Sequence, residues 1–316
     1  MNKQIVRTLS RAVDNIVLLA LLVCLIFAGY SFWDSQQVNA EADVARYATY
    51  KPEPNDTKSF EELRAMNSDV MGWLTIFGTS IDYPVVKAQK NNFEYLSKNP
   101  EGEWESCGSL YVDSANNLNF KDFNTVIHGH HMAEHKMFGD LDLFVDSQFF
   151  NEHQYANLFY DNANHGVEIF AVLKVDAYTP IIGRPNIQDE AEKASLLQKI
   201  RSDQLHGRNT EVTTEDHIVI MATCNLASTN GRFVLVGKIL DHEVPNPFPE
   251  KEKVLPNSTF DIFSLVNNFK NLPVYVWILI LLALILLTGF LYKAERKRLY
   301  RKRLRKKGTP DNVQEK

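Results

Sequence analysis

The sequence predicts a mainly β domain with helical insertions, flanked by two transmembrane helices. Three observations lead to this fold class. About eight short runs rich in β-branched and aromatic residues lie between residues 70 and 240 and are separated by turn residues. The clearest helical pattern covers residues 189–202, with acidic residues in its first turn and basic residues later. Two long apolar stretches stand near the two ends of the chain.

The strand-like runs alternate with polar turns through the central region. The clearest of them read GWLTIFGT, IDYPVVK, GSLYVD, FNTVIH, GVEIFAVLKVDAY, EDHIVIMATC and RFVLVGKIL. A short helix is expected over 60–67, and a helical pattern begins near Met137, with Phe149 and Phe150 in a following turn. Many short strands with one or two crossover helices are typical of a closed or partly closed β-barrel.

The two apolar stretches are long enough to cross a membrane. Ile16–Phe32 has 17 residues without a charge, and Val274–Tyr292 has 19, close to the roughly 20 residues that span a bilayer as a helix. A cleaved signal peptide is the alternative for the first stretch, but no small-residue cleavage site directly follows the apolar run. A buried core helix is the alternative for the second, which the aromatic residues near its ends disfavour.

Charge indicates the orientation of both spans. The segment before residue 16 is basic, and the tail after residue 292 has 11 Lys and Arg residues against three acidic ones. Basic residues flank the cytoplasmic ends of membrane helices, so both termini are expected in the cytoplasm, and the acidic central region outside the cell. A basic tail directly beyond a span is explained by topology and by anionic membrane lipids, and no nucleic-acid partner is expected.

These observations divide the chain into seven segments of a two-pass cell-membrane protein. The expected segments are a cytoplasmic N-terminus over 1–15, a transmembrane helix over 16–33, an extracellular stalk over 34–58, a catalytic domain over 59–241, a second stalk over 242–272, a transmembrane helix over 273–292 and a basic cytoplasmic tail over 293–316.

The small number of cysteines indicates that at least one is a free thiol. Of three cysteines, Cys24 lies inside the first apolar stretch, which leaves Cys107 and Cys224 for one bridge or for at least one free thiol. Cys224 ends a strand and precedes a polar loop, while Arg232 opens the next, antiparallel strand. A cysteine at such a rim can meet a substrate, and a nearby cation favours its thiolate. Inert packing of the cysteine and a solvated strand-edge arginine are the alternatives.

A thiol nucleophile needs an acid–base partner, and histidines gather in TVIHGHHMAEH. In extended geometry His128 and His130 share one face. One hypothesis is a zinc site of His128, His130, His135 and Cys224, which no second cysteine pair or HExxH spacing supports. The other, which the spacing favours, is one catalytic histidine with structural neighbours. On this second hypothesis neither a metal nor another cofactor is expected.

Several of these motifs also resemble a known family. TVIHGHHMAEHKMFGDLDLF resembles the segment around the catalytic histidine of sortases, the cysteine transpeptidases of Gram-positive cell surfaces. IVIMATCNLASTNGRFVLVGKI is similar to their Thr-Leu-x-Thr-Cys … Arg segment, and TSIDYPVVKAQKNNFEYLSKNPEG and GSLYVDSANN resemble the class B branch. The resemblance covers residues 60–240 and implies the eight-stranded sortase barrel. The C-terminal span is similar to that of class C pilin polymerases, whose Asp-Pro lid motif is absent from 34–70.

The resemblance assigns roles to residues at matching positions. It implies Cys224 as the nucleophile, His130 as the general acid and base, and Arg232 as the group that stabilises the oxyanion or the substrate. Ile220 and Met221 stand where the family has Thr and Leu, and His128 stands where class B enzymes usually have Tyr. His128, Thr223 and Asn225 are expected to adjoin the substrate groove.

The function that follows is cleavage of a sorting signal on a surface protein or pilin, and joining of the new carboxyl end to an amine. The amine belongs to a cell-wall precursor or to a pilin lysine. Two alternatives stay open at this point: a catalytically inactive membrane-bound scaffold for surface proteins, and a hydrolytic cysteine peptidase in which water replaces the amine.

Overall fold

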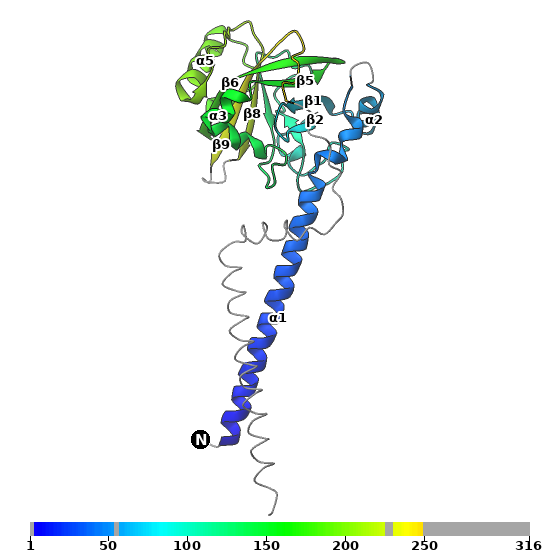
Figure 1. Ribbon diagram of the computed structural model, residues 1–316, viewed down its shortest axis with the longest axis vertical. Coiled ribbons are helices and arrows are strands. Elements are labelled where there is room, and N and C mark those ends of the chain that lie inside the picture. The colour runs from blue at the N-terminus through cyan, green and yellow to red at the C-terminus, as the bar shows by residue number, and fades with distance from the viewer. Residues whose placement is uncertain (1–2, 54–56, 225–229, 249–316) are drawn as a thin grey trace, which may run out of the picture. The chain divides into compact units, whose positions relative to one another are not determined.

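The computed structural model describes residues 3–53, 57–224 and 230–248, and for residues 3–10 and 224 it describes the backbone alone. Nine strands of the described chain form one sheet (Figure 1). The strands are β1 (Val70–Ile76), β2 (Asp82–Lys87), β3 (Leu110–Val112), β4 (Asn124–His128), β5 (Tyr155–Tyr160), β6 (Ala163–Asp176), β7 (Gln204–Gly207), β8 (Ile218–Cys224) and β9 (Gly231–Ile239).

Eight of the strands close into a barrel. The strand order is β5-β1-β2-β3-β4-β8-β9-β6-β7, and a further pairing of β5 with β6 joins the two sides of the sheet. The short strand β7 pairs only with the later part of β6, between Ala171 and Leu173, and stays outside the ring. The predicted eight-stranded barrel is therefore confirmed, with β7 as an addition that the sequence did not reveal.

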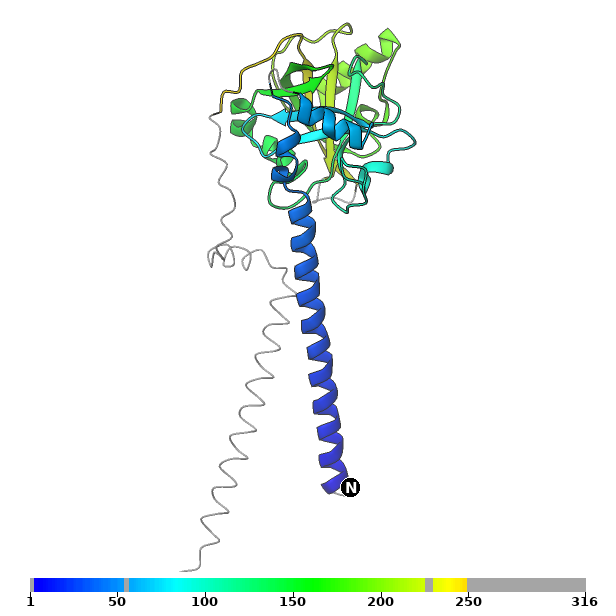
Figure 2. The same cartoon turned by 90° about the vertical axis from the view of Figure 1, so that its right-hand side faces the viewer.

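Helices precede the first strand and, as predicted, are also inserted between strands. They are α1 (Lys3–Glu41), α2 (Lys58–Met66), α3 (Ser147–Glu152), α4 (Pro180–Gly183) and α5 (Glu190–Asp203), with short 3-10 helices η1 (Val44–Arg46), η2 (Ala48–Tyr50), η3 (Glu94–Leu96) and η4 (Gly139–Val145). The Asp189 side chain caps α5 by accepting a hydrogen bond from the Glu192 amide. Figures 1 and 2 show α2 and α5 on opposite sides of the barrel.

The core has three layers, which explains why several strands are apolar at every position. Along β8, Val219 and Met221 point into the barrel, whereas Ile218 and Ile220 pack outside it under α5. A strand buried on both faces reads as a continuous apolar run instead of an alternating one. A third layer lies between α2 and the outer face of the other half of the barrel, with Trp73 at its centre.

Two sequence expectations between residues 136 and 160 need correction. Phe149 and Phe150 lie in helix α3 and not in a turn, because Asp146 caps a helical turn by accepting from the Phe149 amide. The segment YANLFY is strand β5, which closes the barrel. The aromatic and apolar residues on both sides of this boundary hid the change from the helical to the strand spacing of hydrophobic residues.

One helix of the described chain is long and apolar enough to cross a membrane. It covers Arg11–Glu41, has a mean hydropathy of 2.5 and contributes no buried residues in its most apolar window. Within the segment that the sequence presents as a stalk, α1 continues to Glu41, and Ala42 and Tyr47 are buried in the core. The predicted second span over 273–292, most of the second stalk and the basic tail lie outside the described residues.

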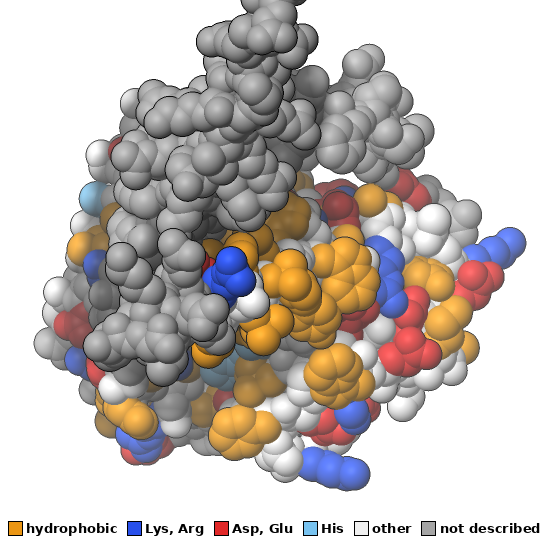
Figure 3. All heavy atoms as spheres, turned by 90° about the horizontal axis from the view of Figure 1, so that it is seen from below, with side chains coloured by type: hydrophobic (Ala, Val, Ile, Leu, Met, Phe, Trp, Pro, Cys, Tyr) orange, Lys and Arg blue, Asp and Glu red, His pale blue; other side chains and the backbone are white. Residues whose placement is uncertain are grey.

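The compact β unit, which spans Tyr30–Glu250, carries both signs of charge. Figure 3 shows the molecule from below, with apolar side chains gathered near the centre of the view and acidic and basic side chains interspersed around them. This mixture fits a domain that faces water on most of its surface.

A glycine of β1 provides a test of this packing. A Cβ atom added at Gly72 would lie 2.6 Å from the Phe159 carbonyl oxygen, whereas one added at Gly183 meets nothing within 4 Å. We expect Gly72→Ala to lower the free energy of unfolding by roughly 1–3 kcal/mol, because the neighbouring strand has to move. Gly183→Ala is the matched control, expected within about 0.5 kcal/mol of the unaltered chain. Thermal and denaturant unfolding of the full chain in detergent measures both, and equal stabilities would contradict the packing described.

Candidate active site

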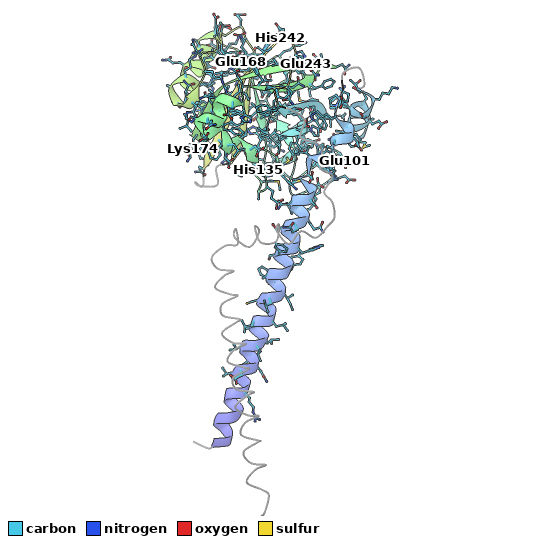
Figure 4. All side chains as sticks on the ribbon, in the orientation of Figure 1. Glu101, His135, Glu168, Lys174, His242 and Glu243 are labelled. Carbon is cyan, nitrogen blue, oxygen red and sulfur yellow. The ribbon has the colours of Figure 1, made fainter. Side chains whose placement is uncertain are left out.

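The strand positions of His128, Cys224 and Arg232 lie at one end of the barrel. Strands β4 and β8 run parallel, with His128 beside Ala222, and β9 runs antiparallel to β8, with Arg232 beside Cys224. The carboxyl ends of β4 and β8 therefore lie next to the start of β9. Figure 4 shows Lys174 and His135 at this end of the barrel and Glu168 at the opposite end.

Gly129 fastens the ends of β4 and β8 together. Its amide donates to the Ala222 carbonyl at 3.2 Å, and its own carbonyl accepts from the Thr223 hydroxyl at 2.8 Å. Only a glycine fits here, because a Cβ atom would lie 2.4 Å from a Leu110 methyl carbon and 2.7 Å from the Phe138 ring. The main chains of His130 and Cys224 thus each follow directly from this hydrogen-bonded contact, on strands that are about 5 Å apart in any sheet.

The imidazole of His130 is held in one orientation. Its Nε2 lies 2.9 Å from the Leu96 carbonyl oxygen, and a carbonyl can only accept, so Nε2 carries the proton in this contact. The His130 carbonyl accepts from the Phe138 amide at 2.9 Å. The half-buried ring therefore has Nδ1 as the nitrogen that can accept or release a proton during a reaction.

The guanidinium of Arg232 lies on the outer face of the barrel. It shares the pleat of β9 with Val234 and Val236, which pack outside the barrel under α5. Its Nη1 donates to the Gly231 carbonyl at 2.9 Å, and none of the ion pairs between described residues involves this arginine. Among the described residues, the guanidinium therefore uses only one of its nitrogens as a donor.

His128 forms a pair with an aspartate that the sequence did not single out. Its Nε2 lies 3.1 Å from the Asp113 carboxylate, which also accepts from the Ala115 amide and the Asn92 side chain. The Tyr111 ring lies 5.2 Å from the imidazole. Burial acts to raise the pKa of Asp113, but the hydrogen bonds from His128, Ala115 and Asn92 outweigh it and hold the pKa below its usual value.

The other predicted residues are distributed as follows. Thr223 is only 2% exposed, and its hydroxyl donates to the Gly129 carbonyl, so it supports the site from within the sheet. Asn225 and the side chain of Cys224 lie outside the described residues. His131 and His135 bind the carboxylates of Asp142 and Asp140, and the histidines of the zinc alternative are thus held by separate partners.

Cys107 is an inert thiol. It is 3% exposed and unbridged, and its sulfur lies 3.7 Å from the Glu105 carboxylate. Burial, together with this carboxylate, raises the pKa of the Cys107 thiol to about 12. A polar cavity of about 330 Å³ lies before β4 and β8, near Asp122 and His217 at the other end of the barrel, and contains none of the predicted site residues.

Known proteins resemble this chain in sequence and in fold. No family model matches the chain. It is 34% identical to sortase B of Listeria monocytogenes over 183 residues, which cover 57% of this chain and 73% of the relative. The chain belongs to the sortase family. Its catalytic domain is of the class B type, and the protein is a cysteine transpeptidase.

Solved sortase structures agree with the barrel described above. The chain is similar to the sortase B from the type II pilus of Streptococcus pneumoniae, with a TM-score of 0.50 and 39% identity, over 58% of this chain and 99% of that one. A class B sortase of Streptococcus pyogenes involved in pilus biogenesis gives a TM-score of 0.52 and 36% identity, over 57% of this chain and 97% of that one. The sortase fold is therefore shown for the described domain.

The sequence did not reveal three groups that hold the histidines of this sortase in place. The Leu96 carbonyl is a backbone group, so no side-chain pattern could identify it. Asp113 and Asn92 lie in polar turns where Asp and Asn are common for conformational reasons. The Gly-His pair at 129–130 was the one available signal, because a glycine directly after an apolar strand often marks a close backbone approach.

The charge on Asp113 is expected to contribute to stability in a pH-dependent way. Because its pKa lies below the unfolded value near 3.8, the contribution is complete above that value and is lost as the pH falls through the folded pKa. We expect Asp113→Asn to lower the melting temperature at pH 7, and the difference from the unaltered sortase to shrink towards pH 3. Melting curves of both proteins between pH 3 and 7 measure this, and a constant difference would contradict it.

Proposed function

We propose that this sortase uses Cys224 as nucleophile, His130 as general acid and base, and Arg232 as the group that stabilises the oxyanion. The observation that carries the proposal is the register at the end of the barrel. Cys224 faces Arg232 across the β8–β9 ladder, and the Gly129 contact puts His130 one residue beyond the point where β4 is tied to β8. A sulfur, an imidazole and a guanidinium thus come from three neighbouring strands.

The reaction is an acyl transfer in two steps. The Cys224 thiolate attacks the scissile carbonyl carbon of a sorting signal, and the tetrahedral intermediate collapses to a thioester as the C–N bond breaks. The proton that the leaving amine needs comes from the imidazolium of His130 at Nδ1, since the Leu96 carbonyl holds Nε2. The incoming amine then attacks the thioester, gives its proton back to His130 and releases the thiolate.

Arg232 acts where negative charge develops. Its fixed guanidinium donates hydrogen bonds to the oxyanion, or holds the carbonyl before attack, and such groups contribute about 3 kcal/mol to the lowering of a barrier. Its place on the outer face of the barrel supports a substrate groove on that face. His128, held by Asp113 on the same face as Val126, adjoins that groove.

The substrates we infer are surface proteins or pilins with a C-terminal sorting signal, and the amine comes from a pilin lysine or a cell-wall precursor. The two streptococcal class B structures described above belong to pilus systems, which supports the pilin alternative. The apolar helix over Arg11–Glu41 supports anchoring in the cell membrane. The apolar stretch over 274–292 adds a second anchor, with both termini cytoplasmic and the barrel outside.

Two membrane anchors suit this reaction, because both reactants are themselves tethered to the cell envelope. Confinement to one surface raises the effective concentration of enzyme and substrates without any new contact. Membrane lipids around the spans, including anionic lipids at the basic tail, are the remaining partners.

The first test removes the nucleophile and its partners one at a time. In a strain that lacks other sortases, Cys224→Ala and His130→Ala are expected to abolish covalent attachment of surface proteins, and Arg232→Ala to lower the rate about 100- to 1000-fold. His242→Ala is the control, since this exposed histidine lies at the other end of the barrel (Figure 4). Attachment is measured by mass spectrometry of envelope-linked proteins.

Each alternative predicts a different outcome of this test. Attachment that continues in the Cys224→Ala strain contradicts the proposed roles. A scaffold would show no selective labelling of Cys224 by a thiol-directed peptide probe. A hydrolytic peptidase would give the same cleaved product with and without an added amine, whereas a transpeptidase transfers the acyl group to the amine.

The second test concerns topology. With both termini cytoplasmic, a green fluorescent protein fused after residue 316 is expected to fluoresce, and alkaline phosphatase fused at the same place is expected to stay inactive. A phosphatase fusion that replaces the chain after residue 248 is expected to be active, because that point lies outside the cell. Activity of the phosphatase after residue 316 would contradict the two-pass arrangement.

A further inference from the structure

The end of α1 is fastened to the loop that follows His130. The carbonyls of the last helical turn have no intrahelical partners, so they need other donors. The Lys136 ammonium donates to one of them, the Asn39 carbonyl, and lies 3.5 Å from the Asp43 carboxylate. A cation at a helix C-terminus also interacts favourably with the helix dipole.

A second contact joins the same two segments through one hydroxyl group. Tyr83 donates to the Ala42 carbonyl at 2.9 Å and accepts from the Met137 amide at 3.1 Å. All three residues are at most 2% exposed, so water cannot replace either hydrogen bond. Burial keeps the pKa of the Tyr83 phenol far above its usual value, and the hydroxyl remains a donor.

The loop itself needs such support. It leaves the barrel at His130 and returns at Phe138, whose amide donates to the His130 carbonyl at 2.9 Å. Between these points Glu134, His135 and Met137 have φ angles of 57°, 62° and 52°, in the left-handed region that side chains disfavour. A conformation of this kind persists only where the surrounding contacts hold it.

We propose that Tyr83 and Lys136 are positioning residues for His130, and that the end of the anchor helix is part of the support of the active site. The inference rests on the proposed role of His130. Tyr83 and Lys136 fix the far side of the loop against residues 39–43, and the loop in turn fixes the main chain of His130. The imidazole is then held in one orientation for its proposed role.

The experiment compares full chains in detergent with Lys136→Met or Tyr83→Phe, which remove the donors but keep the size of the side chains. The substrate is a quenched fluorescent peptide with a sorting sequence that the unaltered chain cleaves. A methanethiosulfonate reagent counts reactive Cys224, with site-resolved mass spectrometry to separate it from Cys24 and Cys107. We expect turnover per reactive Cys224 to fall about tenfold and KM to change less than about twofold.

Counting the reactive Cys224 groups distinguishes a positioning effect from unfolding. Unfolding lowers the number of reactive groups but leaves the turnover of each remaining group unchanged, whereas loss of positioning lowers the turnover of each group. Lys136→Arg keeps the cation and is expected to restore turnover. Lys199→Met is the control, since its ammonium pairs with Asp203 on α5 at 2.8 Å. Hydrogen exchange at the Met137 amide is expected to become faster in Tyr83→Phe.

Turnover per site that stays unchanged in both variants would overturn the inference, even if the Met137 amide exchanged faster. That result leaves the proposed function intact, as long as Cys224→Ala and His130→Ala abolish attachment. If those two variants keep attachment, the proposed function fails first and the positioning role fails with it. Either Tyr83→Phe or Lys136→Met decides the question if the other does not fold.

Discussion

The site depends on a single backbone contact between two parallel strands. Gly129 donates to the Ala222 carbonyl and accepts from the Thr223 hydroxyl, which extends the pairing of β4 and β8 to the residues that follow. The contact is possible only because the position has no Cβ, since the Leu110 and Phe138 side chains fill the space beside it. Packing inside the barrel therefore sets the geometry of groups that act at its mouth.

On the outer face of the barrel, polar side chains hold the residues near this contact in place. The ammonium of Lys87 is buried and donates to the carbonyls of Asp113 and Ser114 at 3.0 and 2.9 Å. Burial lowers the pKa of Lys87, although nearby carboxylates oppose the shift. The lysine thus holds the turn that carries Asp113, and Asp113 holds His128. His128, at the position where the resemblance to class B enzymes implies a tyrosine, thus has Asp113 and the Tyr111 ring as neighbours.

The sequence predicted the parts of the structure that leave a periodic or chemical signal. Helix α5 has a capping aspartate and charges that match its dipole, and β8 and β9 are strongly apolar, so these elements could be placed to within three residues. Strand β5 could not be placed, because YANLFY follows a helix of similar composition and its partners β1 and β6 are distant in sequence. Cys224 and Arg232 could be paired from a short loop between two strands, whereas the Leu96 carbonyl and Asp113 required the fold itself.

The partners of His130 also bear on how the site forms. Leu96 comes 34 residues before it, and the contacts of its loop reach back to Ala42 and Tyr83. Loop closure over such distances costs entropy that is recovered only when the strands between them are paired. The imidazole therefore acquires its orientation late, after β2, β3 and β4 have joined the sheet. With the proposed roles of Cys224 and His130, a chain that has not reached this stage has a thiol without its acid–base partner, and the proposed transpeptidation requires the completed barrel.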